Sequence, residues 1–127
     1  MNENEIGGAV VDCAIKVHRR LGPGLLESVY EAVLSYELQN KGLLVQKQVP
    51  IPIIYENLFF KEAFRADLIV DDKVILELKS VDRVTKAHKK QLLTYLRLSS
   101  KRIGYLLNFG EALMKDGISR IINSKLN

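Results

Sequence analysis

The sequence is poor in the residues and runs that mark several broad classes of protein. Its 127 residues include one cysteine, Cys13, no tryptophan and three prolines. A single cysteine excludes an intramolecular disulfide and a zinc cage of cysteines, and it is typical of a reducing compartment, so we expect a cytoplasmic protein. No apolar run approaches the roughly 20 residues that span a bilayer, and the acidic N-terminus lacks the apolar segment of a signal peptide. We therefore expect no membrane association.

The composition is that of one folded domain. Hydrophobic residues make up 47% of the chain and charged residues 27%, which is ordinary for a globular protein and far from a disordered one. A chain of this length can bury one full core and leaves little room for a second domain. We therefore expect residues 1–127 to form a single domain.

Charge is unevenly distributed along the chain. The formal net charge is +4, but residues 1–80 hold 9 Lys and Arg against 12 Asp and Glu, whereas residues 81–127 hold 10 against 3. A basic segment of this kind either solubilises the surface or attracts phosphates. Charge alone favours a solubilising surface. The carboxylates of the first 80 residues then become the more informative residues.

Hydrophobic periodicity predicts an α/β fold with the order ααβββαβ(α). Some segments carry apolar residues every three or four positions, and others alternate or are continuously apolar. The order implies a mixed four-stranded sheet flanked by helices, with antiparallel hairpins. The predicted helices span residues 4–20, 25–40, 85–98 and 117–123, and the predicted strands span 45–55, 59–70, 74–79 and 103–108.

Two of the predicted strands have an expected place in the sheet. Pro50 and Pro52 cannot donate backbone hydrogen bonds, so residues 45–55 should form an edge strand. Residues 74–79, Val-Ile-Leu-Glu-Leu-Lys, have the apolar character of a central strand with both faces covered.

Two charged residues, Glu77 and Lys79, interrupt this apolar strand. Alternation puts them on one face, and a buried charge needs a partner, a hydrogen bond or an ion. If a three-residue loop pairs Val70 with Val74, Asp67 stands opposite Glu77 on the same face. A two-residue loop would put the two carboxylates on opposite faces. The prediction of a site therefore depends on a three-residue loop or a bulge.

Asp67 and Glu77 on one face would form a hard oxygen site for Mg²⁺ or Mn²⁺, with water completing the coordination. Such a cation polarises a phosphate and lowers the pKa of a bound water, and Lys79 could orient that water or stabilise transition-state charge. The alternative is an internal Glu77–Lys79 pair that only neutralises itself. A second acidic-x-Lys triplet, from Asp71 to Lys73, should be a solvated turn, and it shows how weak this spacing is by itself.

The whole pattern resembles a known group of nucleases. Asp67 followed after nine residues by Glu77-x-Lys79 resembles the PD-(D/E)xK nuclease superfamily, whose αβββαβ core the predicted order matches with one added helix. Residues 24–30, Gly-Leu-Leu-Glu-Ser-Val-Tyr, match the motif that names the GxxExxY protein family. The resemblance implies a restriction-endonuclease-like fold. It covers most of the chain and extends through Arg65 to Asp67, Glu77 to Ser80, Gln91 to Tyr95 and Asn108 to Gly110.

The resemblance also assigns roles to individual residues. Asp67 and Glu77 take the positions of the metal ligands, and Lys79 takes that of the catalytic lysine. Glu27 is similar to an acidic residue that many members carry on the helix before the sheet, as a further ligand or a holder of water. Ala66 stands where the superfamily name has proline, a position that is loosely kept.

Three further residues support the resemblance. Gln91 and Tyr95 resemble the Gln-x-x-x-Tyr element of RecB-like nucleases, and their spacing puts both on one helical face, where they could meet a phosphate or support the lysine. Tyr30 belongs to the GxxExxY motif, and we expect it to pack and donate one hydrogen bond rather than take part in the chemistry.

Six basic residues follow the predicted active strand and are candidates for contact with a nucleic-acid backbone. No aromatic residues are interleaved with them, so nothing favours single-strand or sequence-specific recognition. These residues are Lys86, Lys89, Lys90, Arg97, Lys101 and Arg102.

The sequence thus predicts a Mg²⁺- or Mn²⁺-dependent phosphodiesterase that hydrolyses nucleic acid, with DNA as the expected substrate. Membership of a nuclease family implies the fold more firmly than it implies cleavage. Two alternatives therefore remain, a catalytically silent nucleic-acid-binding module and a protein-interaction domain. Nucleases of this size often act as dimers, so a homodimer is among the expected partners, although no residue pattern identifies an interface.

Overall fold

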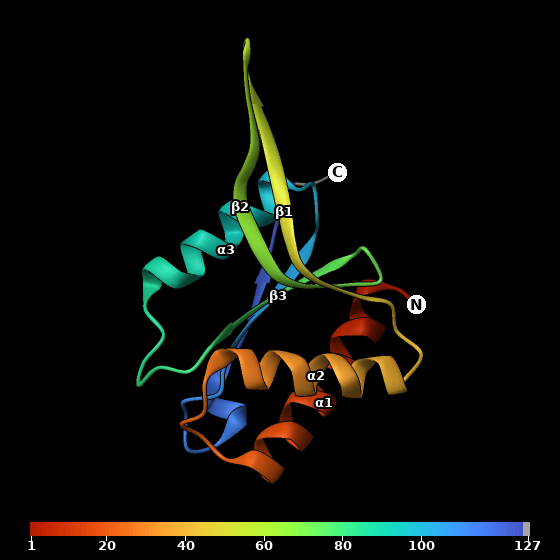
Figure 1. Ribbon diagram of the computed structural model, residues 1–127, viewed down its shortest axis with the longest axis vertical. Coiled ribbons are helices and arrows are strands. Elements are labelled where there is room, and N and C mark those ends of the chain that lie inside the picture. The colour runs from red at the N-terminus through yellow and green to blue at the C-terminus, as the bar shows by residue number, and fades with distance from the viewer. Residues whose placement is uncertain (126–127) are drawn as a thin grey trace.

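The computed structural model describes residues 1–125 and contains one five-stranded sheet with helices on both faces (Figure 1). The strands lie in the order β1-β2-β3-β4-β5; β3 and β4 run parallel, and the other neighbouring pairs are antiparallel. The elements are α1 (Glu3–Leu21), α2 (Glu27–Asn40), β1 (Val45–Tyr55), β2 (Leu58–Val70), β3 (Val74–Lys79), α3 (Lys86–Leu98), β4 (Ile103–Asn108), the 3₁₀ helix η1 (Met114–Gly117) and β5 (Ile118–Ile122).

Two apolar clusters hold these layers together. The larger lies between the sheet and helices α1 and α2, and the smaller lies between the sheet and α3. Strand β3 contributes to both because its side chains alternate: Leu76 and Leu78 belong to the first cluster, and Ile75 belongs to the second. Glu77 and Lys79 share the parity of Ile75, so they lie on the α3 face of the sheet.

The predicted places of β1 and β3 are confirmed. Strand β1, which carries Pro50 and Pro52, is at one edge of the sheet, and β3 is in the middle, with every residue from Val74 to Leu78 buried. No helix within residues 1–125 is both long enough and apolar enough to cross a membrane.

The prediction of a last helix over residues 117–123 is wrong, and so is the count of four strands. Residues 118–122 form β5, which pairs antiparallel with β4 and adds a fifth strand to the sheet. Three isoleucines in this short segment favour a strand. The edge of β4 also offers backbone groups that a single helical turn could not satisfy.

Candidate active site

The loop between β2 and β3 sets the register on which the site depends. Val70 pairs with Val74, so the three-residue loop that the predicted site requires is present. Asp71 and Asp72 adopt φ angles of 51° and 55°, a left-handed conformation that aspartate tolerates better than most residues. The paired residues continue only to Leu68 opposite Leu76. Beyond that pair, the two strands are joined by hydrogen bonds between backbone N–H groups and side-chain carboxylates.

Asp67 and Glu77 lie together where β2 and β3 part. The backbone N–H of Leu78 donates to Oδ2 of Asp67 at 2.8 Å, and the backbone N–H of Asp67 donates to Oε1 of Glu77 at 3.4 Å. Each carboxylate therefore accepts from a backbone donor of the opposite strand. These two bonds fix the carboxylates side by side in the middle of the sheet.

Glu77 is buried, with 8% of its surface exposed. Burial and the nearby charge of Asp67 raise its pKa from 4.5 to about 8, although Lys79 acts in the opposite direction. Neither Glu77 nor Lys79 takes part in an ion pair within the described chain. The alternative explanation, an internal Glu77–Lys79 ion pair that only neutralises itself, is therefore not supported.

The backbone around Lys79 is held from three sides. Its carbonyl accepts from the N–H of Phe109 at 2.8 Å, and the hydroxyl of Ser80 donates to the carbonyl of Leu25 at 2.7 Å. The buried side chain of Asn108 accepts from the N–H of Val81 at 3.1 Å and donates to its carbonyl at 2.9 Å. Lys79 is itself half-buried and projects from a rigid base.

Helix α2 brings two more carboxylates to this place. Glu27, its first residue, lines a small cavity of about 120 Å³ together with Glu31, Gln48 and Asp67. Glu27 is exposed at a helix N-terminus, where a negative charge is stabilised by the helix dipole. The cavity thus joins the motif glutamate to the carboxylate of β2.

Sequence reasoning missed Glu31 and Gln48. The side-chain amide of Gln48 donates to Glu31 at 2.6 Å and lies 3.5 Å from Oδ1 of Asp67. Burial raises the pKa of Glu31, and the charge of Asp67 adds to this effect. The spacing of four between Glu27 and Glu31 was a usable signal, because it places both on one helical face.

Gln48 itself carried no such signal. It has a φ of 50° within a strand, and the ladder of β1 with β2 omits it and Asp67 while pairing the residues on either side. A left-handed residue inside a strand costs of order 1–3 kcal/mol and is most often found at functional sites. The distortion directs the Gln48 amide toward the two carboxylates.

Helix α3 supplies Tyr95 to the same face. Its ring stacks on Phe64 with the centroids 3.8 Å apart. Burial and the charges of Glu77 and Asp67 raise the pKa of the Tyr95 hydroxyl, so this group is close to both carboxylates. Gln91, one turn earlier on the same helix, is exposed.

Tyr30 is placed as a packing residue of the α1–α2 turn. Its hydroxyl donates to the carbonyl of Gly22 at 2.5 Å and accepts from the N–H of Leu25 at 3.1 Å. Its buried ring stacks on Phe109 at 4.4 Å. These contacts hold the segment just before Glu27 against the end of β4.

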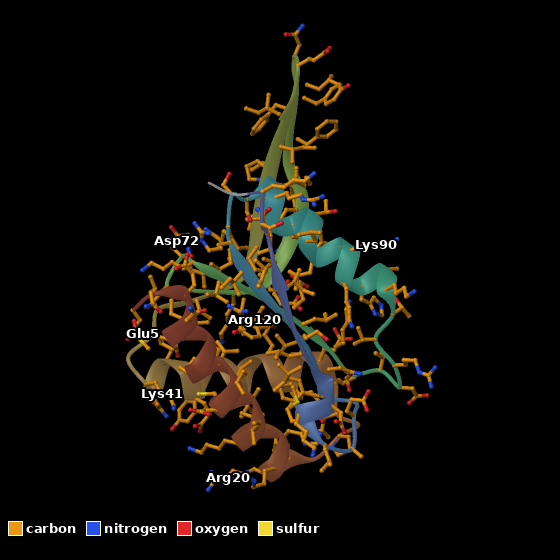
Figure 2. The ribbon with its side chains drawn as sticks, turned by 180° about the vertical axis from the view of Figure 1, so that it is seen from behind. Glu5, Arg20, Lys41, Asp72, Lys90 and Arg120 are labelled. Carbon is orange, nitrogen blue, oxygen red and sulfur yellow. The ribbon has the colours of Figure 1, made fainter. Side chains whose placement is uncertain are left out.

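The structure divides the six basic residues into two groups. Lys86, Lys89 and Lys90 are exposed on the first half of α3, the end that follows β3, and Figure 2 shows Lys90 on the side of the molecule opposite Asp72. Lys101 contacts Asp72 at 3.2 Å near the other end of the parallel strands. Two more belong with it: Arg97 is exposed in the last turn of α3, and Arg102 lies 3.8 Å from Glu3.

Comparison with known proteins agrees with this arrangement. A sequence model of the PD-(D/E)XK nuclease superfamily matches residues 4–121, nearly the whole chain. The chain belongs to the PD-(D/E)XK nuclease superfamily. Neither the curated proteins nor the solved structures gave a match. Membership supports a nuclease-like function, and the five-stranded α/β architecture is consistent with the superfamily fold.

PD-(D/E)XK nucleases generally use divalent metal ions, and the residues of this chain fit one. Asp67 and Glu77 present adjacent carboxylates that form no ion pair within residues 1–125, and burial and the charge of Asp67 raise the pKa of Glu77, so a cation placed there would lower it. Within residues 1–125, no three acidic, histidine or cysteine side chains gather into a complete metal cage. A two-carboxylate site suits Mg²⁺, which keeps several waters and binds substrate phosphate.

In this PD-(D/E)XK protein, replacing Glu77 by Gln should stabilise the metal-free fold at high pH. The folded protein keeps the Glu77 proton up to about pH 8, whereas the unfolded chain loses it near 4.5. The contribution of the Glu77 proton to the free energy of unfolding is therefore fully present below about pH 4.5. It falls as the pH rises from there and is lost once the pH has passed about 8. We expect Glu77→Gln to be more stable than wild type by roughly 1–3 kcal/mol at pH 9 and nearly equal at pH 5. Urea unfolding in the presence of a chelator measures the free energy of unfolding of both proteins at each pH. The same dependence of that free energy on pH in wild type and Glu77→Gln would contradict the prediction.

Proposed function

We propose that this protein is a Mg²⁺- or Mn²⁺-dependent nuclease that hydrolyses phosphodiester bonds of nucleic acid, with DNA as its substrate. The observation that carries the proposal is the adjacent pair of half-buried Asp67 and buried Glu77, beside Lys79, which forms no ion pair within residues 1–125. Placing one buried and one half-buried carboxylate side by side with no ion-pair partner in the described chain lowers stability, and such a cost is typical of functional sites. Membership of a nuclease superfamily supports this explanation.

Asp67 and Glu77 would hold the cation, and Glu27 would reach it directly or through water from the cavity that it shares with Asp67. A divalent cation at this place lowers the pKa of a water and offsets charge on the phosphate. Gln48 and its partner Glu31 would fix the orientation of Asp67. Lys79 would stabilise the negative charge that develops on the phosphate oxygens.

Three lysines at the start of α3 would contact the nucleic-acid backbone. Lys86, Lys89 and Lys90 are exposed in the first half of the helix, and its first turn contains no acidic residue. A positive charge at a helix N-terminus interacts unfavourably with the helix dipole, and each one destabilises the helix by a few tenths of a kcal/mol. Their placement next to the end of the active strand supports a role in phosphate binding rather than in helix stability.

We also place the protein in the GxxExxY family within the superfamily. The supporting observation is that two of the three named residues of the motif, Glu27 and Tyr30, have a definite place beside the site. Glu27 lines the cavity of Asp67, and Tyr30 holds the turn that precedes it.

The proposal is tested by cleavage of plasmid and oligonucleotide DNA with Mn²⁺. We expect Asp67→Asn to lower both Mn²⁺ affinity and cleavage by about 100-fold or more, because it removes a charged ligand. Asp116→Asn changes an exposed carboxylate of η1 and should cleave as wild type does. Equal cleavage by wild type and Asp67→Asn would overturn the proposal. Salt-dependent DNA binding without any cleavage would favour the silent binding module instead.

A further inference from the structure

A further cavity lies where the end of α1 meets the segment around η1 (Figure 1). Its volume is about 570 Å³, which falls within the roughly 300–1,000 Å³ of cavities that bind small molecules. Residues of the last two turns of α1 and of the turn after it line one side, and residues 112–115 line the other. This cavity, which we call the η1 cavity, shares no residue with the small cavity beside Asp67.

The charge of the η1 cavity is positive. Arg19 and Lys115 line it, both are exposed, and neither takes part in an ion pair within residues 1–125. The nearby acids Glu111 and Asp116 do not line it. The C-terminus of a helix carries roughly half a negative charge, which two full positive charges outweigh. The η1 cavity should therefore attract an anion.

The helix dipole does not account for both cations. Arg19 lies in the last turn of α1, where a positive charge stabilises a helix. Lys115 belongs to η1, a separate element on the other side of the cavity. Two cations that face one hollow from different segments are the arrangement that binds a phosphate or a carboxylate from two sides.

Most of the remaining lining is apolar and is held in place. Ile15 and Leu113 contribute from the two sides, and buried Met114 lies between the cavity and the core. His18 is buried, and its Nε2 donates to the carbonyl of Glu111 at 2.7 Å, which fixes the ring. A ligand that fills this cavity should combine an anionic group with a largely apolar body.

The η1 cavity lies close to the candidate nuclease site. Pro23 lines the η1 cavity, and Glu27 lines the cavity of Asp67. Their Cα atoms are at most about 14 Å apart, because four residues of extended chain reach no further. Stacked nucleotides of one strand follow each other at about 3.4 Å. A strand held at Asp67 therefore needs only about four or five nucleotides to bring its end to the η1 cavity.

We propose that the η1 cavity binds a nucleoside monophosphate, either free or as the terminal nucleotide of a strand held at the nuclease site. Arg19 and Lys115 bind the phosphate, and the apolar walls contact the sugar and the base. The choice of a nucleotide rests on the proposed nuclease function. The cavity and its positive charge do not, so an anion site would exist here in a chain that cleaves nothing.

Titration of the isotope-labelled full chain with dAMP, followed by nuclear magnetic resonance, tests the proposal in the presence of EDTA. The chelator keeps metal from the nuclease site, so binding is measured without cleavage. We expect amide shifts at Gly22 and Lys115 and a dissociation constant of about 1 mM or below. Inorganic phosphate and deoxyadenosine should each bind at least about 10-fold more weakly, because each offers only one part of the ligand.

Three variants of exposed residues examine the two parts of the η1 cavity. Arg19→Gln and Lys115→Gln should each raise the dissociation constant of dAMP by about 10-fold, because each removes a charge-assisted contact. Ala112→Trp should raise it by at least about 10-fold, because the indole occupies the space of the ligand. The spectrum of each variant also shows that the chain is folded.

Arg20→Gln is the matched control, because Arg20 is exposed in the same helical turn but does not line the cavity (Figure 2). It should bind dAMP as wild type does, and so should Asp67→Asn. Asp67→Asn separates the two proposals, because it removes a metal ligand and leaves the η1 cavity intact. Loss of cleavage concerns the nuclease, whereas loss of dAMP binding concerns the η1 cavity.

Oligonucleotides with a phosphate at the 5′ end, at the 3′ end or at neither end distinguish the two sources of the ligand. Binding that is at least about 10-fold tighter with one terminal phosphate identifies a strand end. Binding of dAMP with no effect of a terminal phosphate identifies a free nucleotide.

Three results would overturn the proposal. The first is the absence of shifts at the η1 cavity with about 10 mM dAMP and with every phosphorylated oligonucleotide. The second is wild-type affinity in both Arg19→Gln and Lys115→Gln. The third is tighter binding of a glutamate-rich peptide than of dAMP, which would assign the cavity to an acidic protein partner.

Discussion

Replacing Lys79 by Met should lower the rate of DNA cleavage by about 1,000-fold or more while leaving Mn²⁺ binding nearly unchanged. The ammonium group has no carboxylate partner in the described chain, so its removal breaks no ion pair. Methionine keeps the length and the apolar stem of the side chain, so the packing against the sheet should survive. Asp67 and Glu77 remain available to the cation.

The matched control is Lys73→Met, in the second acidic-x-Lys triplet of the chain. Lys73 is exposed in the β2–β3 loop, and its ammonium donates to the carbonyl of Met1 at 2.7 Å. Single-turnover cleavage of an oligonucleotide separates the two lysines, because the control should react as wild type does. Cleavage by Lys79→Met at the wild-type rate would remove this lysine from the mechanism. A parallel loss of Mn²⁺ affinity would assign it to metal binding instead.

Replacing Gly110 by Ala should destabilise the fold by about 3 kcal/mol or more, at the upper end of overpacking. A Cβ at this position would overlap the carbonyl oxygen of Val81 and come within 2.7 Å of its nitrogen. That backbone cannot retreat, because the side chain of Asn108 holds both its N–H and its carbonyl. We expect the melting temperature to fall by about 10 °C.

Gly8→Ala is the control for the Gly110 variant. Gly8 is exposed on α1, and a Cβ there would meet nothing within 4 Å. Alanine should stabilise the helix by about 0.5–1 kcal/mol because it loses less backbone freedom on folding. Differential scanning calorimetry of both variants measures the contrast. A Gly110→Ala protein as stable as wild type would show that the loop after β3 can move, and that Lys79 rests on a softer base.

Most of the fold could be predicted because it is encoded in local patterns. The apolar stripe of α1, the prolines of β1 and the apolar run of β3 each identify an element and its place. The last strand could not be predicted in the same way. Residues 118–122 are too few for periodicity to decide, and their partner is the open edge of β4. An edge of that kind exists only after the rest of the sheet has formed.

The candidate site divides in the same manner. Asp67, Glu77 and Lys79 could be predicted together because alternation and loop length relate them along one hairpin. Gln48 could not, because its contact with Asp67 depends on a left-handed residue inside a strand, and Glu31 was indicated only by its spacing of four from Glu27. The separation of the six basic residues into two groups could not be predicted from the sequence either. Lys86 and Lys101 lie near opposite ends of α3, and ion pairs with distant acids engage Lys101 and Arg102.

The sequence by itself determined the order of helices and strands as far as β4 and the residues of the nuclease motif, and it narrowed the β2–β3 hairpin to two possible registers. These features follow from periodicity and spacing within short segments. Only the tertiary structure decided that the two carboxylates lie side by side where the strands part, and that the outer half of the β1–β2 hairpin leaves its apolar side chains uncovered. Burial and exposure depend on which distant segments come together, and local pattern does not encode that.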